Sequence, residues 1–232
     1  MNSQEFQILD AKIQSMYWGQ IYNSTIIDSD WLLDKSISPG RWAAGYEYMY
    51  VLYRALNDVK PSSILELGLG QTSKLTGQYA KHAGIPHYII EHDEEWIKYF
   101  TGSWDKFSAN TVINILPLKT CMAYGDEYFK YDGFERLIGK NRFELISIDG
   151  PFGGDGKASR RDILDVLPDV LADDFIIMFD DCGRNGEIQT VNDVATILGK
   201  NGCSYEYGCY DGGGYKKTCV FTSKSWKWLI TL

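Results

Sequence analysis

Few residues of this chain are suited to disulfide bonds or to a histidine-rich metal site. The 232 residues include five cysteines, an odd number that forms no C-x-x-C pair, and only three histidines. A chain of this length does not need disulfides in order to fold. We therefore expect a reduced, cytoplasmic protein without a histidine-rich metal site.

Basic residues and long apolar runs are scarce as well. The formal net charge is -8, which argues against a nucleic-acid partner, because a phosphate-binding surface needs an excess of cations. No apolar run approaches the length of a membrane span, and the N-terminal segment MNSQEFQILD lacks the basic and apolar regions of a signal peptide. The hydrophobic share of 44% is enough for one well-filled domain.

Strand-like and helical segments alternate through most of the chain, after two helices predicted over residues 5–21 and 43–59. Alternation of this kind indicates a parallel sheet with helices on both faces. Residues 1–60 are expected to form a helical extension packed on a core that spans residues 61–232. The predicted strands are residues 62–67, 87–91, 111–116, 143–148 and 175–179. The predicted helices are residues 73–84, 94–107, 160–171 and 187–199, with loop and helix over 126–139.

The end of the chain breaks this alternation. Residues 204–210 and 217–222 are both strand-like, and only the segment Asp211–Gly214 separates them. So short a connection joins antiparallel strands only. We therefore predict an α/β fold in one compact domain: a Rossmann-like, doubly wound, mostly parallel sheet that ends in an antiparallel hairpin.

The segment ILELGLGQTS, residues 64–73, is the strongest functional motif. A strand runs into Gly68 and Gly70, and Thr72 begins a helix whose free N–H groups can face a ligand. Glu66 lies where a buried strand should be apolar, so its carboxylate needs a partner such as the ammonium group of a bound amino-acid moiety. The alternative is an ordinary strand–turn–helix without a ligand.

A second acidic residue stands at a meaningful distance from this turn. Glu91 ends the next strand, twenty-one residues after Gly70, close to the spacing of ~20 at which a carboxylate binds ribose hydroxyls. The alternative role for Glu91 is to cap the following helix, although Asp93 fits that role better. The two motifs favour a nucleoside-binding α/β domain.

Carboxylates also follow the fourth and fifth predicted strands. Asp149 and the pair Asp180–Asp181 should converge, because ligands of such sheets lie outside the carboxyl ends of the strands. Three carboxylates suit a hard cation such as Mg²⁺, and Asp149 or Asp180 can otherwise act directly as a general base. Aspartates after strands also commonly cap helices or bind loop N–H groups.

Cations follow Asp149 on a glycine-rich loop. Lys157, Arg160 and Arg161 oppose the dipole of the helix predicted to follow, so a local reason for them is expected. An anionic substrate is one reason, and salt bridges with nearby aspartates (Asp155, Asp162 or Asp165) are the alternative. Near the N-terminus, Arg41, Trp42, Tyr46 and Tyr48 either line the acceptor pocket or belong to the core.

With these motifs in place, the chain resembles the class I S-adenosylmethionine-dependent methyltransferases from about Ser62 to its end. The resemblance implies a seven-stranded sheet whose last strand is antiparallel, with residues 1–60 as the variable substrate cap. It further implies that Glu66, Gly68 and Gly70 hold the methionine part of S-adenosyl-L-methionine and that Glu91 holds its ribose. Asp149 would lie beside the methionine and the substrate.

The strand ends are also similar to those of the catechol-type, metal-dependent O-methyltransferases. In that group the ligands match Asp149, Asp180 and Asp181, except that asparagine is usual at the last position. Lys157 is the candidate for that group's active-site lysine. The stretch from IDGPFGG to SRRDIL resembles sequences assigned to bacterial surface-polysaccharide methylation. The implied reaction is O-methylation of a small anionic, nucleotide- or phosphate-linked precursor in surface-glycan (capsule) biosynthesis.

Two other functions remain open. An oxidoreductase that binds NAD(P) also has a strand–glycine–helix motif and an acid after the second strand, but it usually has a third glycine where this chain has Ser73. A non-catalytic cofactor-binding domain, used for interaction with a partner, is the other alternative. The sequence alone does not identify the methyl acceptor or the oligomeric state.

Overall fold

A seven-stranded sheet forms the centre of the molecule in the computed structural model, which describes residues 3–153 and 156–232. Its strands are β1 (Ile64–Leu67), β2 (His87–Glu91), β3 (Thr111–Ile115), β6 (Phe143–Ile148), β7 (Leu171–Phe179), β8 (Glu206–Gly213) and β9 (Lys216–Thr222). Their order across the sheet is β3-β2-β1-β6-β7-β9-β8. Strands β3, β2, β1, β6 and β7 run parallel to one another, whereas β9 runs antiparallel to both β7 and β8. The predicted Rossmann-like fold with its terminal hairpin is confirmed.

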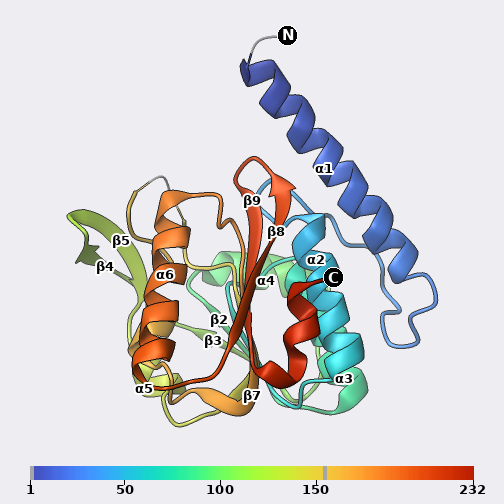
Figure 1. Cartoon of the computed structure of the whole chain (residues 1–232). Helices are drawn as coiled ribbons and strands as arrows, with labels where there is room; N and C mark the ends of the chain where they lie inside the picture. The colour runs from blue at the N-terminus through green and yellow to red at the C-terminus, as the bar shows by residue number, and fades with distance from the viewer. Residues whose placement is uncertain (1–2, 154–155) are drawn as a thin grey trace.

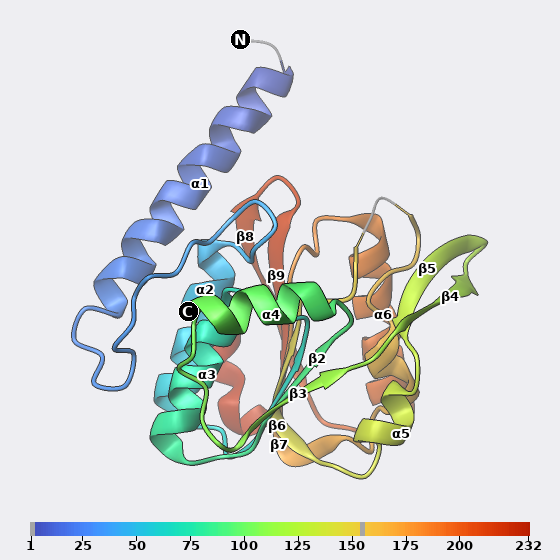
Figure 2. The same cartoon turned by 180° about the vertical axis from the view of Figure 1, so that it is seen from behind.

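Helices cover both faces of this sheet (Figures 1 and 2). The α-helices are α1 (Ser3–Thr25), α2 (Tyr46–Arg54), α3 (Thr72–Ala83), α4 (Glu94–Ser103), α5 (Phe134–Ile138) and α6 (Asn185–Lys200). Shorter helical segments are a π-helix (Ala55–Val59) after α2 and two 3₁₀ segments (Asp162–Asp165 and Lys224–Ile230). Within the described ranges, no helix combines the length and the apolar character needed to cross a bilayer.

The sheet separates two apolar clusters. On one face, α1 and α2 contribute Trp18, Tyr22 and Leu52 to a cluster that includes Ile64 of β1. On the other face, α5 and α6 supply Phe134 and other apolar side chains. The N-terminal half of α1 projects away from the body of the molecule, as Figure 1 shows. The N-terminal helices therefore complete one side of the core through α2 and the second half of α1.

The region after β3 forms a small hairpin that was not predicted from the sequence. Strands β4 (Leu118–Ala123) and β5 (Asp126–Tyr131) form a separate two-stranded antiparallel sheet. Their connection is Tyr124–Gly125, both with positive φ (55° and 84°), as in the tight turns typical of two-residue hairpins. The predicted helix of this region is only the short α5. Many side chains of the hairpin are exposed, so its apolar pattern is weak.

The helix predicted over residues 160–171 is wrong. Only Asp162–Asp165 form a short 3₁₀ segment, and β7 already begins at Leu171. Pro168 lies inside the predicted helix, where its ring would clash and its nitrogen cannot donate a hydrogen bond. Ile163 and Val166 are buried nonetheless, which explains why the apolar spacing resembled that of a helix.

Candidate functional site

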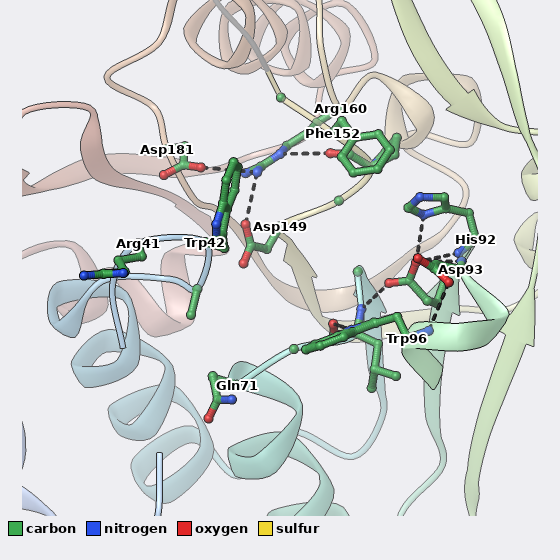
Figure 3. A pocket seen from close by; sticks show the side chains of 18 of the residues that line it. Arg41, Trp42, Gln71, His92, Asp93, Trp96, Asp149, Phe152, Arg160 and Asp181 are labelled. Atoms are coloured by element: carbon green, nitrogen blue, oxygen red, sulfur yellow. Dashed lines mark hydrogen bonds and ion pairs between the residues drawn. The ribbon is translucent and has the colours of Figure 1, made fainter. Parts of the chain in front are cut away.

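A cavity of about 610 Å³ opens at the carboxyl edge of the sheet. We use the term carboxyl edge for the side where β1, β2, β6 and β7 end. The loop before α2, the glycine turn after β1 and the loop after β6 all contribute to its wall, and Figure 3 shows the cavity from close by. Its volume lies within the range of roughly 300–1,000 Å³ that is usual for small-molecule sites.

The two glycines of the ILELGLGQTS turn have different tasks. Gly68 has φ +97°, and a Cβ on it would lie 3.2 Å from the backbone of Asp149 and Gly150. Gly68 therefore lets the ends of β1 and β6 touch. Around Gly70 the described residues place no atom within 4 Å of an added Cβ, and this glycine lines the cavity. Gly70 thus leaves room for a ligand to approach the backbone.

Glu91 lines the cavity and links the glycine turn after β1 to the loop after β2. Its Oε2 accepts a hydrogen bond from the Leu69 N–H at 2.9 Å. Its Oε1 accepts from the N–H groups of His92 (2.7 Å) and Asp93 (3.1 Å). Trp96 closes this unit, because its Nε1–H donates to the Leu69 carbonyl at 2.7 Å. The glycine turn is therefore held by the residue that was predicted to bind ribose.

Asp93 caps α4, as predicted. Its Oδ1 accepts hydrogen bonds from the N–H groups of Glu95 (2.9 Å) and Trp96 (3.0 Å). The capping role considered for Glu91 therefore belongs to Asp93.

Glu66 is buried under the turn, and it is not among the described residues that line the cavity. Its Oε2 lies 3.1 Å from Nε2 of His87, the first residue of β2. Its Oε1 accepts no hydrogen bond within the described part of the chain. The partner required for a carboxylate in this strand is thus a histidine of the neighbouring strand. Thr72 is likewise buried, at the start of α3.

The three aspartates after β6 and β7 converge as expected, with ligand oxygens within 4.8 Å of one another. Asp149 and Asp181 line the cavity, whereas Asp180 is fully buried behind them. Burial, reinforced by the charge of Asp180, raises the pKa of Asp149 well above its usual value. Burial also raises the pKa of Asp180, although Lys216 opposes this effect.

Three cations lie among these carboxylates. Arg160 Nη2 is 3.1 Å from Asp149 Oδ1 and 3.3 Å from Asp181 Oδ2, and Figure 3 shows it between the two. Arg184 Nη1 lies 2.9 Å from Asp181 Oδ2. Lys216 Nζ lies 3.0 Å from Asp180 Oδ2 and 2.6 Å from Asp181 Oδ1. Neither Lys216 nor Arg184 was predicted from the sequence. Lys216 is the first residue of β9, and the antiparallel direction of β9 brings it to the carboxyl edge.

The remaining predicted substrate residues are dispersed. Arg41 lines the cavity, is exposed and has no ion-pair partner among the described residues. Arg161 pairs with Asp193 of α6, a partner outside the three aspartates considered. Neither Arg161 nor Lys157 belongs to the described lining of the cavity. Tyr46 packs beside Tyr22 in the core. Gly154 and Asp155 of the same loop lie outside the described residues.

Two more residues line the cavity: Trp42, which was a candidate for the acceptor pocket, and Gln71, which was not predicted. Trp42 is 97% exposed and lines the cavity, so its ring can contact a bound ligand. Gln71 lies next to the glycine turn, and its Oε1 accepts a hydrogen bond from the Ser38 N–H at 3.2 Å. The loop before α2 is thereby tied to the turn. Proximity to the ELGLG motif was the available signal for Gln71.

No family model and no curated protein sequence matches the chain. Several solved structures, in contrast, have a similar fold. The SAH-bound methyltransferase PaMTH1 of Podospora anserina is 15% identical, with a TM-score of 0.55 over 97% of both chains. An O-methyltransferase from Bacillus cereus, in complex with SAH (S-adenosylhomocysteine), is 14% identical, with a TM-score of 0.51 over 91% of both chains. At such identities the likeness establishes the fold, which this chain shares with these methyltransferases.

Proposed function

We propose that the protein is an S-adenosylmethionine-dependent methyltransferase that acts on an oxygen atom of a small molecule. The observation that carries the proposal is the placement of Gly70, Glu91 and Asp149 around one cavity at the carboxyl edge. The glycine turn that is proposed to bind the nucleoside and an aspartate of raised pKa thereby line the same cavity. The shared fold of SAH-bound methyltransferases supports this function.

The residues of the cavity fit the cofactor. Gly70 leaves open space beside the turn, and Glu91 holds the turn while its carboxylate faces the cavity. The aromatic side chains of Trp96 and Phe152 provide apolar wall on which a flat ring system can rest. S-adenosyl-L-methionine, when bound, supplies an electrophilic methyl group. Glu66 would act indirectly, by supporting the turn through the pair with His87.

Asp149 is the proposed general base. Its side chain is 17% exposed and lines the cavity, so a hydroxyl held there can reach it. The raised pKa makes Asp149 a stronger proton acceptor than an ordinary aspartate. Arg160 fixes its orientation through the contact of 3.1 Å. Asp180 is fully buried, so the proposal leaves it the electrostatic role of raising the pKa of Asp149.

The acceptor is proposed to carry an anionic group. Arg41 supports this, because it is a lining cation without an ion-pair partner in the described ranges. A nucleotide-linked or phosphorylated precursor of a surface glycan, such as a capsule, belongs to this chemical class. Residues 1–60 would act as the substrate cap on the core of residues 61–232. Mg²⁺ is left out of the proposal, because Arg160 and Lys216 already contact the three aspartates.

Isothermal titration calorimetry tests the proposal, with SAH and NAD titrated separately into the protein. We expect saturable binding of SAH and none of NAD. Glu91→Ala should weaken SAH binding by about 1–3 kcal/mol, because hydrogen bonds to the ligand and to the Leu69 N–H are lost. Preferential binding of NAD would favour the oxidoreductase alternative, and absence of both would favour the interaction domain.

A further inference from the structure

The carboxylate cluster of Asp149, Asp180 and Asp181 has the composition of a divalent metal site. One oxygen from each residue can be chosen so that all lie within 4.8 Å of one another. Within this cluster, Asp180 Oδ1 is buried and accepts no hydrogen bond from residues 3–153 and 156–232. Three carboxylates alone would carry a charge of about -3, which the interior of a protein does not tolerate without a counter-charge.

That counter-charge is already present in side chains. Lys216 bridges two of the three carboxylates, with Nζ 3.0 Å from Asp180 and 2.6 Å from Asp181. Its side chain is only 12% exposed. Arg160 bridges a second pair, Asp149 and Asp181.

Most of the negative charge of this cluster is compensated by side chains, without an added ion. Arg184 adds a third cation through its contact with Asp181. Arg160 and Arg184 also lie near the buried carboxylate of Glu187, at 3.8 and 3.5 Å, so three cationic side chains face four carboxylates. A dication placed among the same oxygens would lie within a few ångströms of an ammonium group and would be repelled by it. The residues present therefore do not fit Mg²⁺ as a resident ion.

We propose that Lys216 replaces the divalent metal in this cluster, so that the site is independent of metal ions. Its ammonium group bridges Asp180 and Asp181, as a shared metal ion would, and holds them in place. Lys216 is a positioning residue, because it contacts the carboxylates and is not among the described residues that line the cavity. The consequence for activity rests on the proposed function, whereas the metal-binding property does not.

The test is a titration with Mn²⁺, followed by the electron paramagnetic resonance of the free ion. The wild-type protein should show no saturable binding at up to millimolar Mn²⁺. Lys216→Met removes the ammonium group and should create a site that binds Mn²⁺ at least about tenfold more tightly than the wild type, because an excess of negative charge is left. Lys216→Gln is a second neutral variant in case the methionine variant does not fold.

Two controls isolate the effect of the charge. Lys216→Arg retains the cation and should not bind Mn²⁺. Lys217→Met removes the adjacent lysine of β9, which pairs across the hairpin with Asp211, and should behave as the wild type. Saturable Mn²⁺ binding by the wild type that Asp180→Asn abolishes would overturn the proposal. So would a folded Lys216→Met variant that gains no Mn²⁺ binding. SAH calorimetry on the same samples reports separately on the proposed function.

Discussion

Replacing Gly68 and Gly70 separately by alanine should have different effects. The change at Gly68 should lower the stability of the fold, and the change at Gly70 should weaken ligand binding. Gly68 combines φ +97° with backbone atoms 3.2 Å from an added Cβ. The left-handed conformation alone costs about 1–2 kcal/mol in a residue with a side chain, and the Asp149–Gly150 backbone cannot turn aside as a flexible side chain would. We expect Gly68→Ala to lose at least this much stability.

Gly70→Ala should leave the stability of the fold nearly unchanged and should weaken ligand binding. Its φ lies outside the left-handed region, and the described residues leave its Cβ position open, so stability should change by no more than about 0.5 kcal/mol. The new methyl group would occupy the space through which the ligand approaches the turn. We expect SAH binding to weaken at least about tenfold, or ~1.4 kcal/mol.

Thermal unfolding and SAH calorimetry, measured on both variants, check this pair. Gly84→Ala is a matched control for φ, because Gly84 also has a positive φ (+70°) but an open Cβ position at the end of α3. It should lose stability but not SAH affinity. Wild-type SAH affinity in Gly70→Ala would refute the placement of the ligand beside this glycine. Wild-type stability in Gly68→Ala would refute the tight contact of β1 with β6.

The remaining predictions concern charged groups. Asp149 must be deprotonated to act as a base, and its pKa is raised by burial and by Asp180, so the rate should fall with decreasing pH at values above the ~4 of an ordinary aspartate. Asp149→Asn should lower kcat far more than SAH affinity, and retained turnover would place the base elsewhere. Arg41→Ala should raise KM for a phosphorylated acceptor about tenfold or more. The ion pair of Arg161 lies away from the cavity, so Arg161→Ala should leave KM unchanged. Equal effects of the two substitutions would contradict the assignment of Arg41 to the acceptor. Burial, with the charge of Asp180, raises the pKa of Glu47 to about 7, so its stabilising protonated form is lost as pH rises through that value. Glu47→Gln should therefore raise the melting temperature at pH 8 and matter least near pH 5; the reverse trend would show that the buried carboxylate is stabilised as an anion.

The parts of the fold that the sequence predicted are those with local causes. Gly84 ends α3 in the left-handed conformation, and the short glycine-rich connection between β8 and β9 allows only a hairpin. The prediction failed for residues 160–171, because the burial of Ile163 follows from the path of a loop over the core and not from a helix. No local pattern distinguishes these two causes of burial.

The site was predictable only where its residues follow strands. Asp149 and Glu91 end or follow parallel strands, so their convergence at one edge could be inferred. Lys216 begins a strand, and its position depends on the reversed direction of β9. The partner of Glu66 was equally hidden, because His87 reads as an ordinary strand residue until the pairing of β1 with β2 is known. Such contacts follow from the topology of the sheet and not from motif spacing.

The packing of α2 and the second half of α1 against the sheet limits how the part of the cavity proposed to hold the acceptor can change. Tyr48 of α2 is fully buried and shares a hydrogen bond of 2.7 Å with Ser147 of β6, two residues before Asp149. The same N-terminal segment carries Arg41 and Trp42 to the rim of the cavity. A mutation that moves this segment to admit a new acceptor would therefore also disturb the packing beneath the proposed base. New specificity is expected to arise first in the exposed loop before α2, where side chains can change without altering the core.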